Sequence, residues 1–120
     1  MYINEIEWLD IINKEAILHV VNEGKCIRAF SCPCNYKMGD VLAEPLECID
    51  IENVIIYDDK EDIEKLEGTF DYILRGRLLN KDYGIFRVYG FDIHINSEKI
   101  PKDILEGEYI QFVTSRIDVW

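Results

Sequence analysis

Residues 72–88, YILRGRLLNKDYGIFRV, set the fold class, because two runs rich in aliphatic and aromatic side chains flank a short polar turn. The turn at residues 81–84, KDYG, contains residues that tolerate positive φ, as a β-hairpin requires. The same arrangement recurs in residues 16–30, AILHVVNEGKCIRAF, where residues 22–25 (NEGK) separate two apolar runs. Two such hairpins predict an antiparallel β-protein.

The rest of the chain has the same texture, with short β-branched and aromatic runs bounded by turn residues. This spacing is typical of an all-β sandwich or barrel. Strands are therefore expected at 3–11, 15–21, 25–31, 41–49, 53–57, 69–79, 84–95 and 108–119. Alternation of apolar positions within these runs predicts a core of Leu18, Val20, Phe30, Leu74, Ile93, Ile95, Ile110 and Phe112.

One helix is expected near residues 59–67. Asp58 or Asp59 can cap the segment KEDIEKLEG, and Gly68 can end it. A helix of about two turns is marginal alone, so it would have to pack on the strands. A shorter turn is expected in residues 100–107, IPKDILEG, where a proline sets φ and a glycine closes the turn.

An internal similarity links residues 39–51, GDVLAEPLECIDI, with residues 107–119, GEYIQFVTSRIDV. The two segments align without a gap, Gly39 matches Gly107, and a hairpin precedes each. The likeness either reflects only that both strands begin with glycine and an acid, or predicts two pseudo-repeated, three-stranded halves that close one barrel, with the helix as their connector. Such a barrel resembles the OB-fold and related small β-barrels. The fold expected is therefore mainly β with one short helix: a small, antiparallel, OB-like barrel.

The composition indicates a single globular domain over residues 1–120. The chain has 24 acidic and 13 basic residues, which give a net charge of −11 that would repel a nucleic-acid backbone. No apolar run reaches membrane-spanning length, so no membrane association is expected. Residues 1–10, MYINEIEWLD, lack the basic and apolar regions of a signal peptide, which indicates a cytoplasmic protein.

The cysteines are spaced poorly for a metal site. Structural zinc sites commonly contain pairs of cysteines two to four residues apart. Here one pair has a single intervening residue and no second close pair exists, so no metal and no cofactor are expected; a zinc-stapled adaptor is the alternative. The four residues on which that alternative depends are Cys26, Cys32, Cys34 and Cys48. His19 and His94 lie in separate strands and have no local partner for metal binding or acid–base chemistry.

Acidic residues concentrate in residues 58–67, where they form either a solvated surface or a negative ridge that meets a basic partner. No phosphate-binding loop, nucleophile elbow or zinc-protease motif is present, so the protein is not expected to be an enzyme. Trp8 is a candidate aromatic anchor, since aromatic side chains dominate interface energetics. The expected partner-binding residues are Asp58, Asp59, Glu61, Asp62, Glu64 and Trp8, with Glu67 completing the acidic run.

The arginines suggest a second kind of surface. All five of them fall in expected strands, and Arg75 and Arg77 share a strand face. OB-like barrels bind ligands on a strand surface with aromatic residues for stacking. An alternative ligand face therefore consists of Arg75, Arg77, Arg87 and Tyr89.

Two functional hypotheses follow. The first is a small acidic protein-binding module, an inhibitor such as an immunity protein of a nuclease toxin or a phage anti-defence protein, with a basic protein as its partner. The alternative is an OB-like binder of single-stranded nucleic acid or an oligosaccharide through the arginine face. The net charge of −11 makes nucleic acid the less favoured ligand.

Overall fold

The computed structural model describes all 120 residues, and it confirms a mainly β fold. Its one helical segment is a single 3-10 turn, η1 (Ser97–Lys99). The chain has no helix with the length and apolarity that crossing a membrane requires. The strands are β1 (Tyr2–Asp10), β2 (Glu15–Asn22), β3 (Lys25–Ser31), β4 (Leu46–Ile56), β5 (Asp62–Lys65), β6 (Tyr72–Asn80), β7 (Ile85–Val88), β8 (Phe91–His94) and β9 (Tyr109–Asp118).

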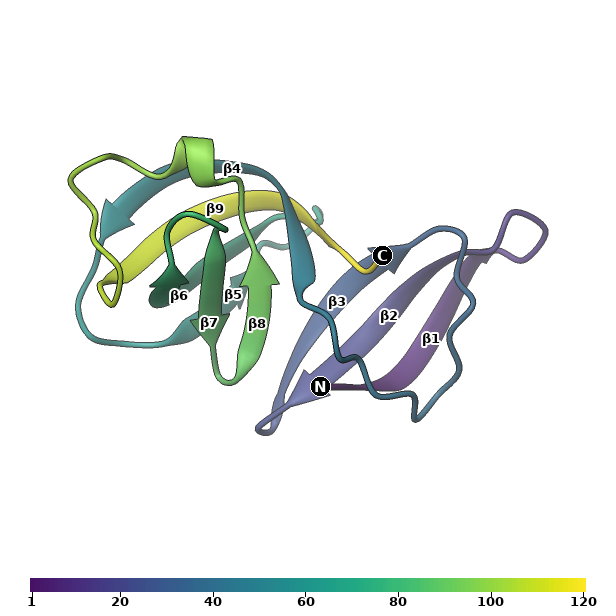
Figure 1. Cartoon of the computed structure of the whole chain (residues 1–120). Coiled ribbons are helices and arrows are strands. Elements are labelled where there is room, and N and C mark those ends of the chain that lie inside the picture. The colour runs from purple at the N-terminus through teal and green to yellow at the C-terminus, as the bar shows by residue number, and fades with distance from the viewer.

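Five strands form a small closed barrel (Figure 1). Around the ring, β4 pairs with β9, β9 with β6, β6 with β7, β7 with β8, and β8 returns to β4. The β4–β8 pair that completes the ring is parallel, while the other four pairings are antiparallel. Strand β5 extends this structure by pairing with the first half of β6. The result resembles OB-like small barrels at the level of the fold.

Strands β1, β2 and β3 form a separate antiparallel meander beside the barrel (Figure 1). Its one strand pairing with the barrel is the parallel contact of Phe30 with Asp118, between β3 and β9. Tyr72 of β6 reinforces this joint, because its hydroxyl accepts a hydrogen bond from the backbone N–H of Arg28 at 2.9 Å. The molecule is consequently elongated, with extents of 45 × 27 × 24 Å.

One hydrophobic core runs through both parts. Ile3, Leu18 and Ile27 of the meander belong to the same buried cluster as the side chains that fill the barrel. Inside the barrel the rings of Phe86 and Phe112 pack edge to face, with centroids 4.9 Å apart. Every predicted core residue is fully buried except Phe30. That ring is half-buried because the Arg116 guanidinium lies 4.4 Å from its centroid.

The predicted helix near residues 59–67 is wrong, because this segment contains strand β5. Residues 62–65 pair with residues 72–75 of β6, so the ladder satisfies backbone groups that a two-turn helix would leave unpaired at both ends. The shorter turn expected in residues 100–107 is present: the backbone N–H of Ile104 donates to the Pro101 carbonyl, and Gly107 has a φ of +89°.

The structure agrees only in part with the predicted pseudo-repeat. Gly39 and Gly107 do share a φ of +89°, and the matched strands β4 and β9 pair with each other. However, β1 to β3 lie outside the ring, so the two halves do not close one barrel together. Expected strands 41–49 and 53–57 are instead a single strand, β4, that starts at Leu46.

The expected strand at 84–95 is a hairpin. Tyr89 and Gly90 form its two-residue turn with φ values of 45° and 76°, the positive values that a type I′ turn requires. The turn predicted at residues 22–25 is confirmed, with Glu23 and Gly24 also at positive φ.

Candidate functional site

The acidic segment, residues 58–67, borders the outer face of the barrel. Its first residues form a connection after β4, and its later residues belong to β5 at the edge of the sheet. The side chain of Asp62 accepts a hydrogen bond from the Arg75 guanidinium at 2.8 Å. Glu61 accepts the backbone N–H of Tyr89, while the Tyr89 hydroxyl donates to the Glu61 carbonyl at 2.9 Å. These contacts fasten the segment to β6 and to the β7–β8 turn.

The remaining carboxylates of the acidic segment are exposed, and none of them makes a side-chain hydrogen bond or ion pair. They are Asp58, Asp59, Glu64 and Glu67. The segment predicted as one ridge therefore divides into two acids that hold the fold and four that face solvent.

Pairing register continues this negative surface across the barrel. Glu64 of β5 lies opposite Ile73, Ile73 lies opposite Val113, and Val113 lies opposite Glu52 of β4. These four residues form one outward row with a carboxylate at each end and two half-buried apolar side chains between them. A protein surface with apolar centre and charged border has the anatomy of an interface.

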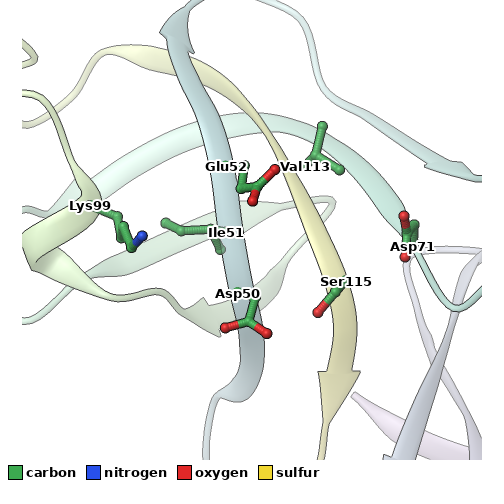
Figure 2. A pocket seen from close by; sticks show the side chains of 7 residues that line it. All are labelled: Asp50, Ile51, Glu52, Asp71, Lys99, Val113 and Ser115. Carbon is green, nitrogen blue, oxygen red and sulfur yellow. The ribbon is translucent and has the colours of Figure 1, made fainter.

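A shallow hollow of about 300 Å³ lies beside this row (Figure 2). Asp50, Glu52 and Asp71 line it together with Ser115, and Lys99 of η1 stands at its rim. Three carboxylates against one ammonium group keep this part of the face negative. Sequence reasoning missed the hollow, because two of its acids lie in β4 and the third, Asp71, lies just before β6, and only the sheet brings these segments together.

The arginines predicted as a ligand face do lie together. Arg75 and Arg77 both point outward from β6, and Arg77 lies directly opposite Arg87 of β7. Tyr109 flanks Arg77 on its other side, and Tyr57 lies beneath Arg75 with 5.0 Å between guanidinium and ring centroid. Tyr89, which was predicted with them, is instead committed to the acidic segment.

Most of this positive charge is already neutralised within the chain. Arg75 pairs with Asp62, and Arg87 holds Asp92 through two hydrogen bonds of 2.6 and 3.1 Å. These hydrogen bonds, which Arg87 donates to the Asp92 carboxylate, raise the pKa of Arg87. Arg77 is the exception, because its guanidinium donates only to the carbonyl of Gly107.

The two arginines outside this face are also paired. Arg28 donates to Glu7 at 2.6 Å, and this hydrogen bond lowers the pKa of the glutamate. Arg116 donates to both oxygens of buried Asp118 at 2.6 and 2.7 Å, which raises the arginine pKa. Each of the five arginines except Arg77 thus has a carboxylate partner in its own chain.

Trp8 lies apart from the acids with which it was predicted. It projects from β1, at the opposite edge of the sheet order from β5. Its neighbours Leu9, Ile11 and Ile12 are also exposed, so the end of the β1–β2 hairpin is apolar. Sequence reasoning missed these three residues. The available signal was a pair of isoleucines in a turn, where polar residues are usual.

The cysteines and histidines do not converge. No group of three or more His, Cys, Asp and Glu side chains is arranged to hold a metal ion. The cysteines are free thiols, with Cys26 and Cys32 exposed and Cys34 and Cys48 buried. Each histidine sits beside a glutamate instead: His94 is 2.8 Å from Glu47, and His19 is 3.1 Å from Glu7.

The four cysteines should differ in how fast their thiols react. Burial raises the pKa of Cys48 to about 12, and thiolates are the reactive form. In the native protein at pH 8, two thiols should react with a disulfide reagent, Cys32 before Cys26, because desolvation also raises the pKa of Cys26. Four should react after unfolding in urea. Prompt reaction of four thiols in the native protein would contradict the burial of Cys34 and Cys48.

The candidate functional features of this molecule lie on its surface. This surface offers four unpaired carboxylates on the acidic segment, a largely neutralised arginine cluster and an apolar hairpin end. Comparison with protein-family models, with curated proteins and with solved structures found no match to the chain.

Proposed function

We propose that this chain is a non-catalytic, acidic protein-binding module whose acidic segment docks against a basic partner protein. One observation carries the proposal: four of the five arginines are paired with carboxylates of the same chain, whereas Asp58, Asp59, Glu64 and Glu67 remain exposed and unpaired. The eight lysines form no ion pair either, so the surface displays charge of both signs, but the sum is −11 and the surface is predominantly negative. Such a surface steers a basic protein into contact and raises its association rate.

The finer form of the proposal is an inhibitor, such as an immunity protein of a nuclease toxin or a phage anti-defence protein, acting in the cytoplasm. A nuclease must present a basic surface to its nucleic-acid substrate. A small domain with a net charge of −11 complements that surface and competes with the substrate. Addition of one equivalent of the chain should then suppress the activity of the partner nuclease.

The proposal is tested by neutralising the free carboxylates. The variant combines Asp58→Asn, Asp59→Asn, Glu64→Gln and Glu67→Gln, and it leaves Glu61 and Asp62 in place because they hold the segment to the barrel. Its association rate with the partner, measured by biolayer interferometry at low salt, should fall about tenfold or more. The dissociation rate should change much less.

A matched control removes the same number of charges elsewhere. Asp82→Asn, Glu98→Gln, Asp103→Asn and Glu44→Gln alter exposed carboxylates that make no side-chain hydrogen bond. This variant should slow association less than about threefold. Equal slowing in both variants would mean that net charge alone acts, and the acidic segment would not be the docking site.

The second candidate function, an OB-like binder of single-stranded nucleic acid or an oligosaccharide, is favoured by the alignment of Arg75, Arg77 and Arg87 beside Tyr109. Internal ion pairs on Arg75 and Arg87 oppose it, as does the net charge. We therefore expect no measurable binding of a fluorescent oligothymidylate at physiological salt. Micromolar binding that weakens steeply with salt and is lost in Arg77→Ala would favour this candidate instead.

A further inference from the structure

The hairpin tip, formed by Trp8, Leu9, Ile11 and Ile12, exposes large apolar side chains that contribute little to the folded core. Ile12 is 91% exposed and Ile11 74% exposed, while Leu9 and Trp8 are about half exposed at 55% and 45%. The tip lies at the end of the molecule remote from the barrel (Figure 1). Exposed apolar side chains gathered around one turn of a highly charged protein mark a candidate interaction site.

The side chain of Asp10 holds the turn at the tip through three hydrogen bonds. One carboxylate oxygen of Asp10 accepts the backbone N–H groups of Ile12 and Asn13, at 3.0 and 3.1 Å. The other accepts the side-chain amide of Asn13 at 2.8 Å. These three hydrogen bonds fix the backbone that carries the isoleucines, so presenting them to a partner costs little conformational entropy.

The loop after β3 also contacts this turn. The backbone N–H of Cys34 donates to the carbonyl of Lys14 at 2.7 Å, and the Lys14 ammonium donates to Asn35 at 3.1 Å. The Cys32 thiol lies 3.7 Å from the carbonyl of Asn13. The loop after β3 therefore stabilises the conformation of the turn.

The strand leading to the tip also has a free edge. On its outer side, β1 is hydrogen-bonded only around Met1 and Ile3, by residues 39–42 of the loop between β3 and β4. From Glu5 onward it pairs with β2 alone. Half of the backbone N–H and C=O groups in this stretch are thus available to another chain.

We propose that the hairpin tip inserts into an apolar pocket of a basic protein partner, next to the free edge of β1. The inference rests on the proposed function and adds a second, apolar contact to the electrostatic one. Because β1 and β5 lie at opposite ends of the strand order, the partner must span the elongated molecule to reach both contacts. An anionic lipid surface is disfavoured, because it repels a protein with a net charge of −11. A second copy is disfavoured because each chain carries −11, and β1 contributes Glu5, Glu7 and Asp10 but no basic residue.

The test places a photo-crosslinking amino acid at Ile12, at Asp59 of the acidic segment or at Leu105, an exposed leucine on the barrel. Each variant is irradiated in the native host cell, and the products are identified by mass spectrometry. Ile12 and Asp59 should crosslink to the same basic protein, and Leu105 should not. That protein is then purified for binding measurements.

The binding measurement compares two double variants against the purified partner. Ile11→Ser with Ile12→Ser should raise the dissociation rate about tenfold or more, without altering the salt dependence of association. Tyr83→Ser with Leu105→Ser removes similarly exposed side chains that lie away from β1, and it should leave binding unchanged. Equal circular dichroism spectra would show that both variants fold.

The other outcomes overturn the inference and are distinguishable from failure of the proposed function. Crosslinking at Asp59 but not at Ile12, or unchanged dissociation of the tip variant, removes the tip from the interface and leaves the acidic contact intact. Crosslinking of Ile12 to a second copy would show that the tip binds another copy of this chain. Flotation with phosphatidylglycerol vesicles, without a protein crosslink at Ile12, would show that it binds lipid. Absence of a protein crosslink at both positions overturns both proposals.

Discussion

Replacing Gly76 with alanine is expected to lower the free energy of unfolding by about 3 kcal/mol or more. Gly76 lies on the inner side of β6, where a Cβ atom would meet the backbone oxygen of Arg87 at 2.3 Å and the Phe86 ring at 2.8 Å. A backbone carbonyl in a paired strand cannot rotate away, so β6 and β7 would have to separate. Because these strands belong to the closed ring, the whole barrel would be strained.

Urea unfolding measures this effect, and Gly68→Ala is its control. Gly68 has a φ of +75°, but nothing lies within 4 Å of its missing Cβ, so only backbone conformation opposes the substitution. Its cost should be about 1 kcal/mol. If Gly76→Ala were no more destabilising than Gly68→Ala, the close approach of β6 to β7 would not exist.

Removing the Arg116 side chain should cost about 2 to 3 kcal/mol, because it leaves a buried carboxylate without its partner. The side chain of Asp118 is 5% exposed, and Arg116 holds both of its oxygens. The same guanidinium packs on Phe30, which pairs with Asp118 where β3 meets β9. Arg116→Ala therefore weakens the joint between the three-stranded meander and the barrel.

Arg87→Ala provides the comparison, since it breaks an ion pair of similar geometry on an exposed surface. The side chains of Arg87 and Asp92 are 49% and 38% exposed, and solvent screening limits such a pair to less than about 1 kcal/mol. Urea unfolding of both variants gives the two values. Equal losses would show that Asp118 remains well solvated without its arginine.

Strand positions could be predicted because alternation is a local property. Leu74 and Phe112 face inward exactly as their apolar spacing indicates, and both are fully buried. The helix at residues 59–67 was mispredicted because the competing strand, β5, is stabilised by hydrogen bonds to β6. Those hydrogen bonds depend on the tertiary fold and are not visible in the local sequence. The Tyr89–Gly90 turn was missed because tyrosine rarely adopts a φ of 45°.

The candidate site was predictable in composition but not in arrangement. Clustered acids in residues 58–67 are visible in the sequence, whereas the use of Asp62 by Arg75 depends on the pairing of β5 with β6. Trp8 could be named as a candidate anchor, whereas its separation from the acids depends on the position of β1 at the outer edge. Long-range pairing thus decides which charges remain free.

The most direct measurement of the proposed electrostatic docking is the association rate of the wild-type chain with its basic partner as a function of salt. Between about 0.05 and 0.5 M sodium chloride, we expect this rate to fall about tenfold or more, since salt screens the exposed carboxylates of the acidic segment. The dissociation rate should stay nearly constant over the same range. An association rate that does not depend on salt would contradict docking through the acidic segment.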